Sequence, residues 1–299
     1  EFSNIIRKRD NYTENAVQQA IQQAEREMIA NGIVAVGDIC NTGDTLLQKQ
    51  KDNLKYYNFI ETFGVDVKKE NVLFNQAIEL RNKFRCAGLK ASIVPHAPYS
   101  VPPALTRKIN SAFDGSDELI TIHMQETKEE NQLFENQRGP FLNWLNSMNA
   151  TSSIWLNRRK STDILQELEG KKVLLVHNTF TKKEDITDNY YCTCPRANLY
   201  IENELPDYSI FDANKLCVGS DSLASNDSLS ILDELLIIQN NSNFDFNILI
   251  KIACENGAKA LGFEQLGTFE KGKVPGVNLI QNLDDTKLIS ESRVQVIMN

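Results

Sequence analysis

The feature that most constrains this chain is an alternation of apolar runs of strand length with segments of helical period, from about residue 14 to residue 261. In this pattern each strand is followed by a helix that crosses back over the sheet, so neighbouring strands run parallel and the fold is α/β. The apolar runs predict strands at 33–38, 56–63, 89–94, 119–123, 173–177, 189–193 and 215–221.

Helices are predicted between these strands. The first covers Glu14–Ala30 and ends at Asn31-Gly32, a common C-cap signal. Others are expected over 67–86, from about 102, over 229–239 and over 246–261. A polar-faced stretch over 127–149 separates the fourth and fifth strands.

The predicted strands number seven, one fewer than the eight that close a (β/α)8 barrel. We therefore expect a TIM-type barrel over residues 1–264 that lacks its first strand, as if the chain were trimmed just ahead of Glu1. Residues 265–299 contain a turn and two further strands, near 277–280 and 292–297. We interpret this tail as a small β element of a second, β-sandwich domain.

Composition narrows the classes of function. Acidic residues outnumber basic ones by 40 to 32, which disfavours a general nucleic-acid binder. No apolar run reaches the roughly 18 residues of a membrane span, and no signal peptide is seen, so a cytoplasmic location is expected by default. We interpret the cysteines as reduced core thiols; they are Cys40, Cys86, Cys192, Cys194, Cys217 and Cys254.

The histidines carry the main functional signal. The chain has three, His96, His123 and His177, each at the end of a predicted strand, and Asp221 ends a fourth. The carboxyl ends of barrel strands meet at one face, so these groups should converge, and imidazole and carboxylate ligands suit a divalent transition metal. One such histidine alone is more often structural, but four aligned groups favour a metal-dependent site.

Glu126 follows His123 by three residues, which would bring its carboxylate beside a water that a metal activates. It is the natural candidate for a proton shuttle. The alternative is an ordinary acidic residue at a helix N-terminus, with Thr127 and Glu130 as its local capping partners.

Several motifs occur in a familiar order: HAPYS at 96–100, HxxET at 123–127, VHN at 176–178, CPxxN at 194–198 and GSDSxxSN at 219–226. As a set they resemble the amidohydrolase superfamily. The order and spacing are similar to its deaminase and chlorohydrolase branch, which includes cytosine, guanine, S-adenosylhomocysteine and aminofutalosine deaminases. The resemblance covers roughly residues 20 to 280.

The resemblance implies a role for each site residue. His123 and Asp221 would be metal ligands, Glu126 would shuttle protons, and His177 would polarise the hydrolytic water or the substrate. Asp221 would also accept a proton from the attacking water, and His96 would contact substrate. The cofactor would be one divalent metal, zinc or alternatively iron, because the fourth strand position offers no lysine for a second ion.

The family's His-x-His motif is absent from the sequence. We expect two further histidine ligands upstream of Glu1, and we expect this fragment alone to bind metal weakly or not at all and to be inactive. The implied function is deamination, or another hydrolysis of a C–N or C–Cl bond, of a heterocyclic or purine-like small molecule by a metal-bound water. The alternative is a metal-free, non-catalytic barrel that serves as a binding or scaffold protein.

The implied partner is a small-molecule substrate, and neither nucleic acid nor a membrane is expected as a partner. Because relatives in this branch commonly form dimers or larger assemblies, a homodimer is a further alternative. Four aromatic residues could line a pocket for a flat ring, although packing in the core or in loops explains them equally well. They are Tyr99, Trp144, Phe180 and Tyr200.

Overall fold

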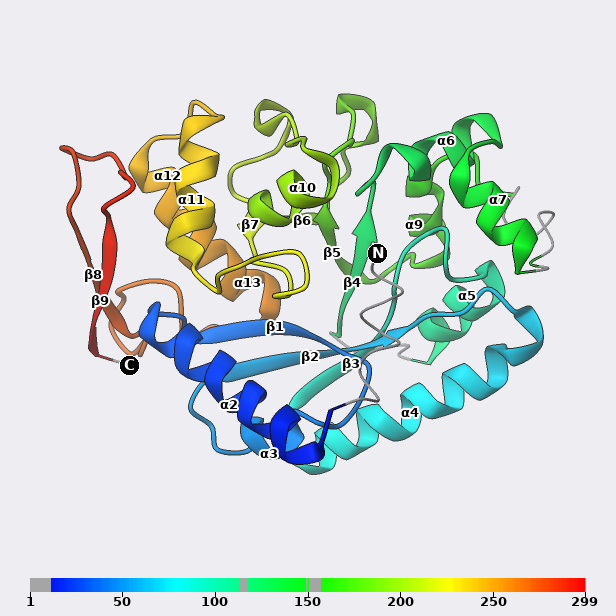
Figure 1. Ribbon diagram of the computed structural model, residues 1–299, viewed down its shortest axis with the longest axis horizontal. Coiled ribbons are helices and arrows are strands. Elements are labelled where there is room, and N and C mark those ends of the chain that lie inside the picture. Colours follow the sequence, from blue (N-terminus) through cyan, green and yellow to red (C-terminus); the bar gives the residue numbers. More distant parts are fainter. Residues whose placement is uncertain (1–11, 113–117, 149, 151–156, 299) are drawn as a thin grey trace.

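The structure is a computed structural model, and it describes residues 12–112, 118–148, 150 and 157–298. The alternation of strands and helices that the sequence predicts is present, and the strands of the α/β part all run parallel (Figure 1). This confirms the α/β class with parallel sheets.

Two parallel sheets form the centre of the molecule. The first has the order β1-β2-β3, with β1 at Ala35–Cys40, β2 at Lys55–Thr62 and β3 at Lys90–Pro95. The second has the order β4-β5-β6-β7, with strands at Leu119–Met124, Lys172–His177, Tyr190–Thr193 and Leu216–Val218. The sheets meet between β3 and β4, where the His123 N–H donates to the His96 carbonyl at 2.9 Å. The TIM-type barrel that lacks its first strand stays a prediction.

Helices cover the outer faces of both sheets (Figure 1). Those beside the first sheet are α2 (Glu14–Ala30), α3 (Leu46–Lys49) and α4 (Glu70–Cys86). The others are α5 (Pro103–Ser111), α6 (Lys128–Asn136), α7 (Pro140–Ser147), α9 (Ile164–Glu167), α10 (Pro195–Glu202), α11 (Ile231–Asn240), α12 (Phe246–Lys251) and α13 (Gly257–Leu261). Short 3-10 turns lie at Val67–Lys69, Ser161–Asp163, Lys183–Asp185 and Tyr208–Ile210.

The ends of α2 show why the sequence places this helix so well. The Thr13 side chain accepts a hydrogen bond from the Ala16 N–H at the start, and Gly32 adopts a left-handed φ of 76° after the end. The predicted helix over 246–261 is less regular, because a π-helical turn at Ile252–Asn256 separates α12 from α13.

The core lies on both faces of the strands, as parallel strands under crossover helices require. Phe59, Ile93, Ile120 and Leu175 are among its buried side chains. The interpretation of all six cysteines as core thiols is wrong at two positions: Cys40, Cys194 and Cys217 are buried, whereas Cys86 and Cys254 are exposed on the helical layer.

The tail forms an antiparallel pair, β8 (Val277–Gln281) with β9 (Arg293–Met298), along one side of the molecule (Figure 1). It is tied to the helical layer because the Gln239 side chain bonds the Leu288 carbonyl at 3.0 Å and the Leu288 N–H at 2.8 Å. The domain boundary near residue 264 and the wider β-sandwich stay predictions.

Among the described residues, no helix combines the length and the apolar character needed to cross a membrane. The expected cytoplasmic location and the homodimer alternative stay predictions.

Candidate active site

The structure brings the three histidines together at the carboxyl ends of neighbouring strands. His96 directly follows β3, His123 lies near the end of β4, and His177 is the last residue of β5. The ring centres of His96 and His123 are 4.9 Å apart, and those of His123 and His177 are 5.4 Å apart. The convergence that the strand ends predict is therefore present, although the roles of these residues stay predictions.

Hydrogen bonds fix the orientation of two of these rings. His123 Nδ1 donates to the His96 carbonyl at 2.9 Å, and His177 Nδ1 donates to Asn198 Oδ1 at 2.9 Å. With Nδ1 protonated, the neutral ring leaves the Nε2 lone pair available. Such a partner behind a histidine is typical of metal sites and of sites that move protons.

The backbone around the site departs from ordinary geometry. Gln125, His177, Asn178 and Asp221 adopt left-handed φ values of 48°, 72°, 57° and 57°. Non-glycine residues rarely adopt this region, and they cluster at functional sites where the surrounding structure holds them. These residues lie at or just beyond the ends of β4, β5 and β7, close in sequence to the predicted ligands and the predicted proton shuttle.

Glu126 faces the site, and other residues cap helix α6. Its Oε1 lies 3.6 Å from His177 Nε2. Thr127 Oγ1 accepts from the Glu130 N–H at 3.3 Å, while Glu130 accepts from the backbone of Gln125 at 2.9 Å and of Glu126 at 3.3 Å. The capping pair predicted as an alternative thus exists, but it leaves the Glu126 carboxylate outside it.

Asp221 stands beyond its strand. The prediction of a strand over 215–221 is wrong at its end, because β7 stops at Val218 and Asp221 is in a left-handed turn. Its Oδ2 accepts a hydrogen bond from the Ser225 hydroxyl. The carboxylate is therefore placed by the loop after β7 rather than by the strand itself.

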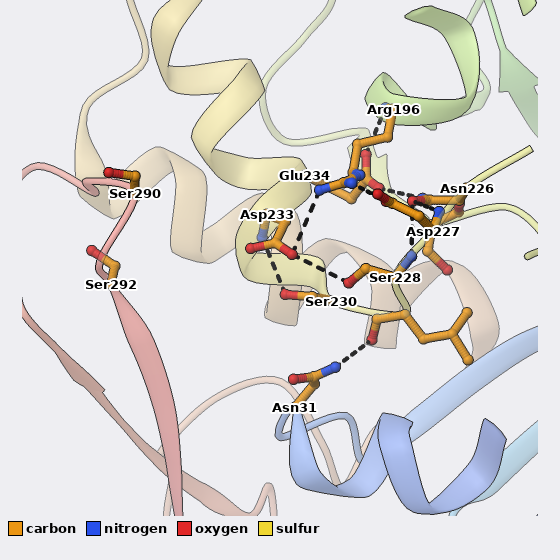
Figure 2. Close-up of polar contacts among 12 residues, drawn as sticks. Asn31, Arg196, Asn226, Asp227, Ser228, Ser230, Asp233, Glu234, Ser290 and Ser292 are labelled. Carbon is orange, nitrogen blue, oxygen red and sulfur yellow. Dashed lines mark hydrogen bonds and ion pairs between the residues drawn. The ribbon is translucent and has the colours of Figure 1, made fainter. Parts of the chain in front are cut away.

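That loop is anchored from behind. Asn226 Nδ2 donates to the Ser220 carbonyl and to Glu234 Oε1, both at 2.7 Å, and the buried Glu234 also accepts from the Arg196 N–H at 2.9 Å. Figure 2 shows Asn226, Glu234 and Arg196 meeting between the loop and helix α11. Burial raises the pKa of Glu234 to about 7.

Glu61 is a site residue that the sequence reasoning missed. It lies near the end of β2, and its carboxylate is grouped with His96 and His123, with ligand atoms all within 4.8 Å of one another. Oε1 is 3.5 Å from His123 Nδ1, and Oε2 accepts from Asn41 Nδ2 at 3.0 Å. An acid near the end of an apolar strand was the available signal, as it was for Asp221.

The electrostatics of the rings differ. Burial, with the charges of His123 and His177, holds the pKa of His96 well below its usual range, so His96 is neutral. Burial also lowers the pKa of His123, but the nearby carboxylates outweigh it and the net shift is upward; they are Glu61, Glu126 and Asp221. The site thus concentrates negative charge around His123.

Aromatic rings border the histidines. Phe63 and Tyr99 meet the His96 ring edge-on, with centres 5.3 Å and 5.9 Å away. Phe63 is 49% exposed, and Trp144 lies beside it at 6.4 Å. Of the remaining candidates, Phe180 lies under the Lys128 ammonium and its N–H donates to the Gln125 carbonyl at 3.0 Å. Tyr200 lines a surface hollow with Arg196 and Leu223.

The donors present fit a divalent metal. Imidazole and carboxylate are ligand types that zinc and iron accept, and ligand atoms of Glu61, His96 and His123 lie within 4.8 Å of one another. Chemically, the cluster could hold a cation, and Glu126 and His177 could move a proton beside it.

Comparison with known proteins decides the family. The family model described as Amidohydrolase family matches residues 2–295, nearly the whole chain. The chain belongs to the amidohydrolase family. The resemblance predicted from the motifs is thereby confirmed.

Proteins similar to this amidohydrolase carry deaminase names. An adenosine deaminase of Helicobacter pylori is 28% identical over 86% of this chain and 66% of its own length. An aminodeoxyfutalosine deaminase of Nitratiruptor sp. is 24% identical over 99% of this chain and 75% of its own length. The chain thus spans about two thirds to three quarters of the length of these relatives.

Solved structures of deaminases resemble the fold. Helicobacter pylori aminofutalosine deaminase in complex with methylthio-coformycin matches with a TM-score of 0.76 and 26% identity, covering 91% of this chain and 69% of that one. An adenosine deaminase from Xanthomonas campestris with bound zinc matches with a TM-score of 0.68 and 19% identity, covering 90% and 62%. At that identity the second match supports the fold alone.

Proposed function

We propose that this chain carries the catalytic part of a metal-dependent hydrolase that removes an amino group from a purine-like small molecule, in a closed barrel of the family type. The observation that carries the proposal is the meeting of Glu126 with His177, 3.6 Å apart, beside the oriented ring of His123. The deaminase names of the relatives support the reaction class.

His123 and Asp221 would hold the metal, zinc or alternatively iron. The Nε2 atom of His123 is available because Nδ1 is committed to the His96 carbonyl at 2.9 Å. When bound, the metal would lower the pKa of a water toward neutrality. The negative charge supplied by Asp221 and the neighbouring glutamates suits a divalent cation.

Glu126 would move the protons. In hydrolytic deamination a water adds to the carbon that bears the amino group, and ammonia leaves. The Glu126 carboxylate takes a proton from the water and returns it to the departing nitrogen. His177, held by Asn198 at 2.9 Å, polarises the same water through Nε2, while Asp221 serves as a second proton acceptor.

The substrate would be a flat heterocycle. Phe63 presents an exposed ring edge-on to His96, and Tyr99 flanks the same histidine. Aromatic rings and a neutral His96 accommodate an uncharged base. Relatives named for adenosine and for methylthioadenosine point to the purine nucleoside class.

The test is metal analysis of the full-length protein together with ammonia release across a panel of aminated purines, purine nucleosides and pyrimidines. We expect one divalent metal per chain and release of ammonia from at least one purine compound. Protein that binds metal but releases no ammonia from any compound would instead be a binding protein. Protein without metal would remove the basis of the mechanism.

A further inference from the structure

Glu61 has a carboxylate oxygen without a hydrogen-bond partner among the residues that the structure describes. The residue lies near the end of β2, at the same face of the sheet as His96 and His123. Its side chain is 9% exposed, and Oε1 is buried with no hydrogen-bond partner among the described residues. A buried acceptor without a donor is costly, so such an atom inside a site points to a donor supplied by a ligand.

Neighbouring groups do not satisfy this oxygen. Asn41 occupies only Oε2, at 3.0 Å. His123 Nδ1 is 3.5 Å from Oε1, but its proton is directed to the His96 carbonyl at 2.9 Å. Glu61 therefore is not the group that orients His123, because the backbone already does this.

We propose that Glu61 Oε1 accepts a hydrogen bond from an O–H or N–H group of the bound substrate, other than the amino group that leaves, and is a specificity-determining residue. The proposal rests on the proposed function. Glu61 lies on the Nδ1 side of His123, whereas the proposed metal would bind Nε2 at the opposite edge of that ring, because Nδ1 is committed to the His96 carbonyl. The substrate group that donates to Glu61 would thus lie away from the carbon that loses ammonia.

Glu61 is also placed to distinguish a substrate that carries this donor group from an analogue that lacks it. A site built to bond a polar substrate group rejects an analogue that lacks the group, because the site's own buried atom is then left unpaired. Asn41 holds one carboxylate oxygen in place, so the free oxygen has a fixed direction. Phe63, two residues further on, lies beside His96 and would flank the same part of the substrate.

The test uses full-length, zinc-loaded protein with Glu61→Gln and Glu61→Ala. The matched control is Glu118→Gln, because Glu118 Oε2 is likewise buried without a partner but stands at the amino end of β4, away from the site. Kinetic constants are measured for adenosine and for its three monodeoxy analogues, each lacking one hydroxyl. These hydroxyls are the only donors of adenosine outside its amino group. Bound zinc is measured in every sample.

We expect Glu61→Ala to lower kcat/KM for adenosine by about 100-fold with zinc content unchanged, and Glu118→Gln to have no such effect. One monodeoxy analogue should react equally slowly with wild type and Glu61→Ala. If Glu61→Ala lowers kcat/KM by the same factor for adenosine and for all three analogues, the proposal is overturned. Loss of zinc in Glu61→Gln also overturns it, since Glu61 would then be a metal ligand.

Failure of the proposed function is recognised separately. If zinc-loaded wild type releases no ammonia from adenosine, the proposed activity on it is wrong, and adenosine becomes a binding probe. Calorimetric titration of the same variants then decides the role of Glu61. The proposal is supported if Glu61→Ala binds adenosine more weakly than wild type does and if this difference disappears with one monodeoxy analogue. Adenosine binding that is the same in both proteins contradicts it.

Discussion

Asn198 holds His177 from two sides: its Oδ1 accepts from His177 Nδ1 at 2.9 Å, and its Nδ2 donates to the His177 carbonyl at 3.4 Å. The amide therefore fixes both the tautomer and the backbone of a residue with a left-handed φ of 72°. His177 is positioned by a helix of the next βα unit, because Asn198 lies in α10.

Asn198→Ala should lower the rate of ammonia release by about 10- to 100-fold, because the His177 ring loses the acceptor that keeps Nε2 directed at Glu126. Thermal unfolding should show a folded protein. Asn189→Ala, at the opposite end of β6, is the control and should keep full activity. A rate for Asn198→Ala equal to that of the control would contradict this account of the ring.

Asn226→Ala should weaken metal binding by about 10- to 100-fold. The reason is that Asn226 links the Ser220 carbonyl to Glu234 and so holds the turn that carries Asp221. Competition with a chelator measures the affinity, and the exposed Asn241→Ala on the same helical layer is the control. Unchanged metal affinity in Asn226→Ala would show that Asp221 is placed without this link.

Arg158 is a buried support behind the loop that follows His96. Its side chain is 2% exposed, pairs with Glu167 at 2.7 Å and donates to the Val101 carbonyl at 3.1 Å. Arg158→Met should reduce the free energy of unfolding by about 3 to 5 kcal/mol, because Glu167 is left without its counter-charge. The double change with Glu167→Gln should recover part of this loss in urea denaturation. A loss under about 1 kcal/mol in the single variant would contradict the assignment.

Burial raises the pKa of the Glu130 carboxyl to about 7 from a usual value of 4.5. Between these values the folded chain keeps a proton on Glu130 that the unfolded chain releases. The free energy of unfolding should therefore fall as pH rises from 4.5 to about 7, by on the order of 3 kcal/mol for this group. Denaturation at both ends of the window measures the slope. Glu130→Gln should flatten it, and an unchanged slope would mean that another group, such as Glu234, causes it.

The fold was largely readable from the sequence because parallel strands buried on both faces appear as continuous apolar runs. The helix predicted from about Glu14 to Ala30 matches α2, because Asn31-Gly32 marks its end in the sequence. The π-helical turn at Ile252–Asn256 was not predicted, because its residues follow a helical pattern and only the packing reveals the extra residue in the turn. The end of β7 was overestimated because an apolar run does not disclose a left-handed φ at Asp221.

The site was partly readable. Histidines at strand ends are conspicuous, and the topology of parallel strands carries them to one face. Glu61 was missed because its partners lie 35 and 62 residues further along the chain, and an acid within a strand pattern resembles a solvent-facing residue. The anchoring of the loop by Asn226 and Glu234 depends on tertiary packing, which residue spacing does not encode.

The central claim is that Glu126 moves protons in a metal-dependent deamination, and the most direct measurement is the rate of ammonia release by zinc-loaded, full-length Glu126→Gln. The variant keeps the shape of the side chain but cannot take up the proton. We predict a rate lower by about 100- to 10,000-fold, with zinc content equal to that of wild type. A rate within a few-fold of wild type at equal zinc content would contradict the account.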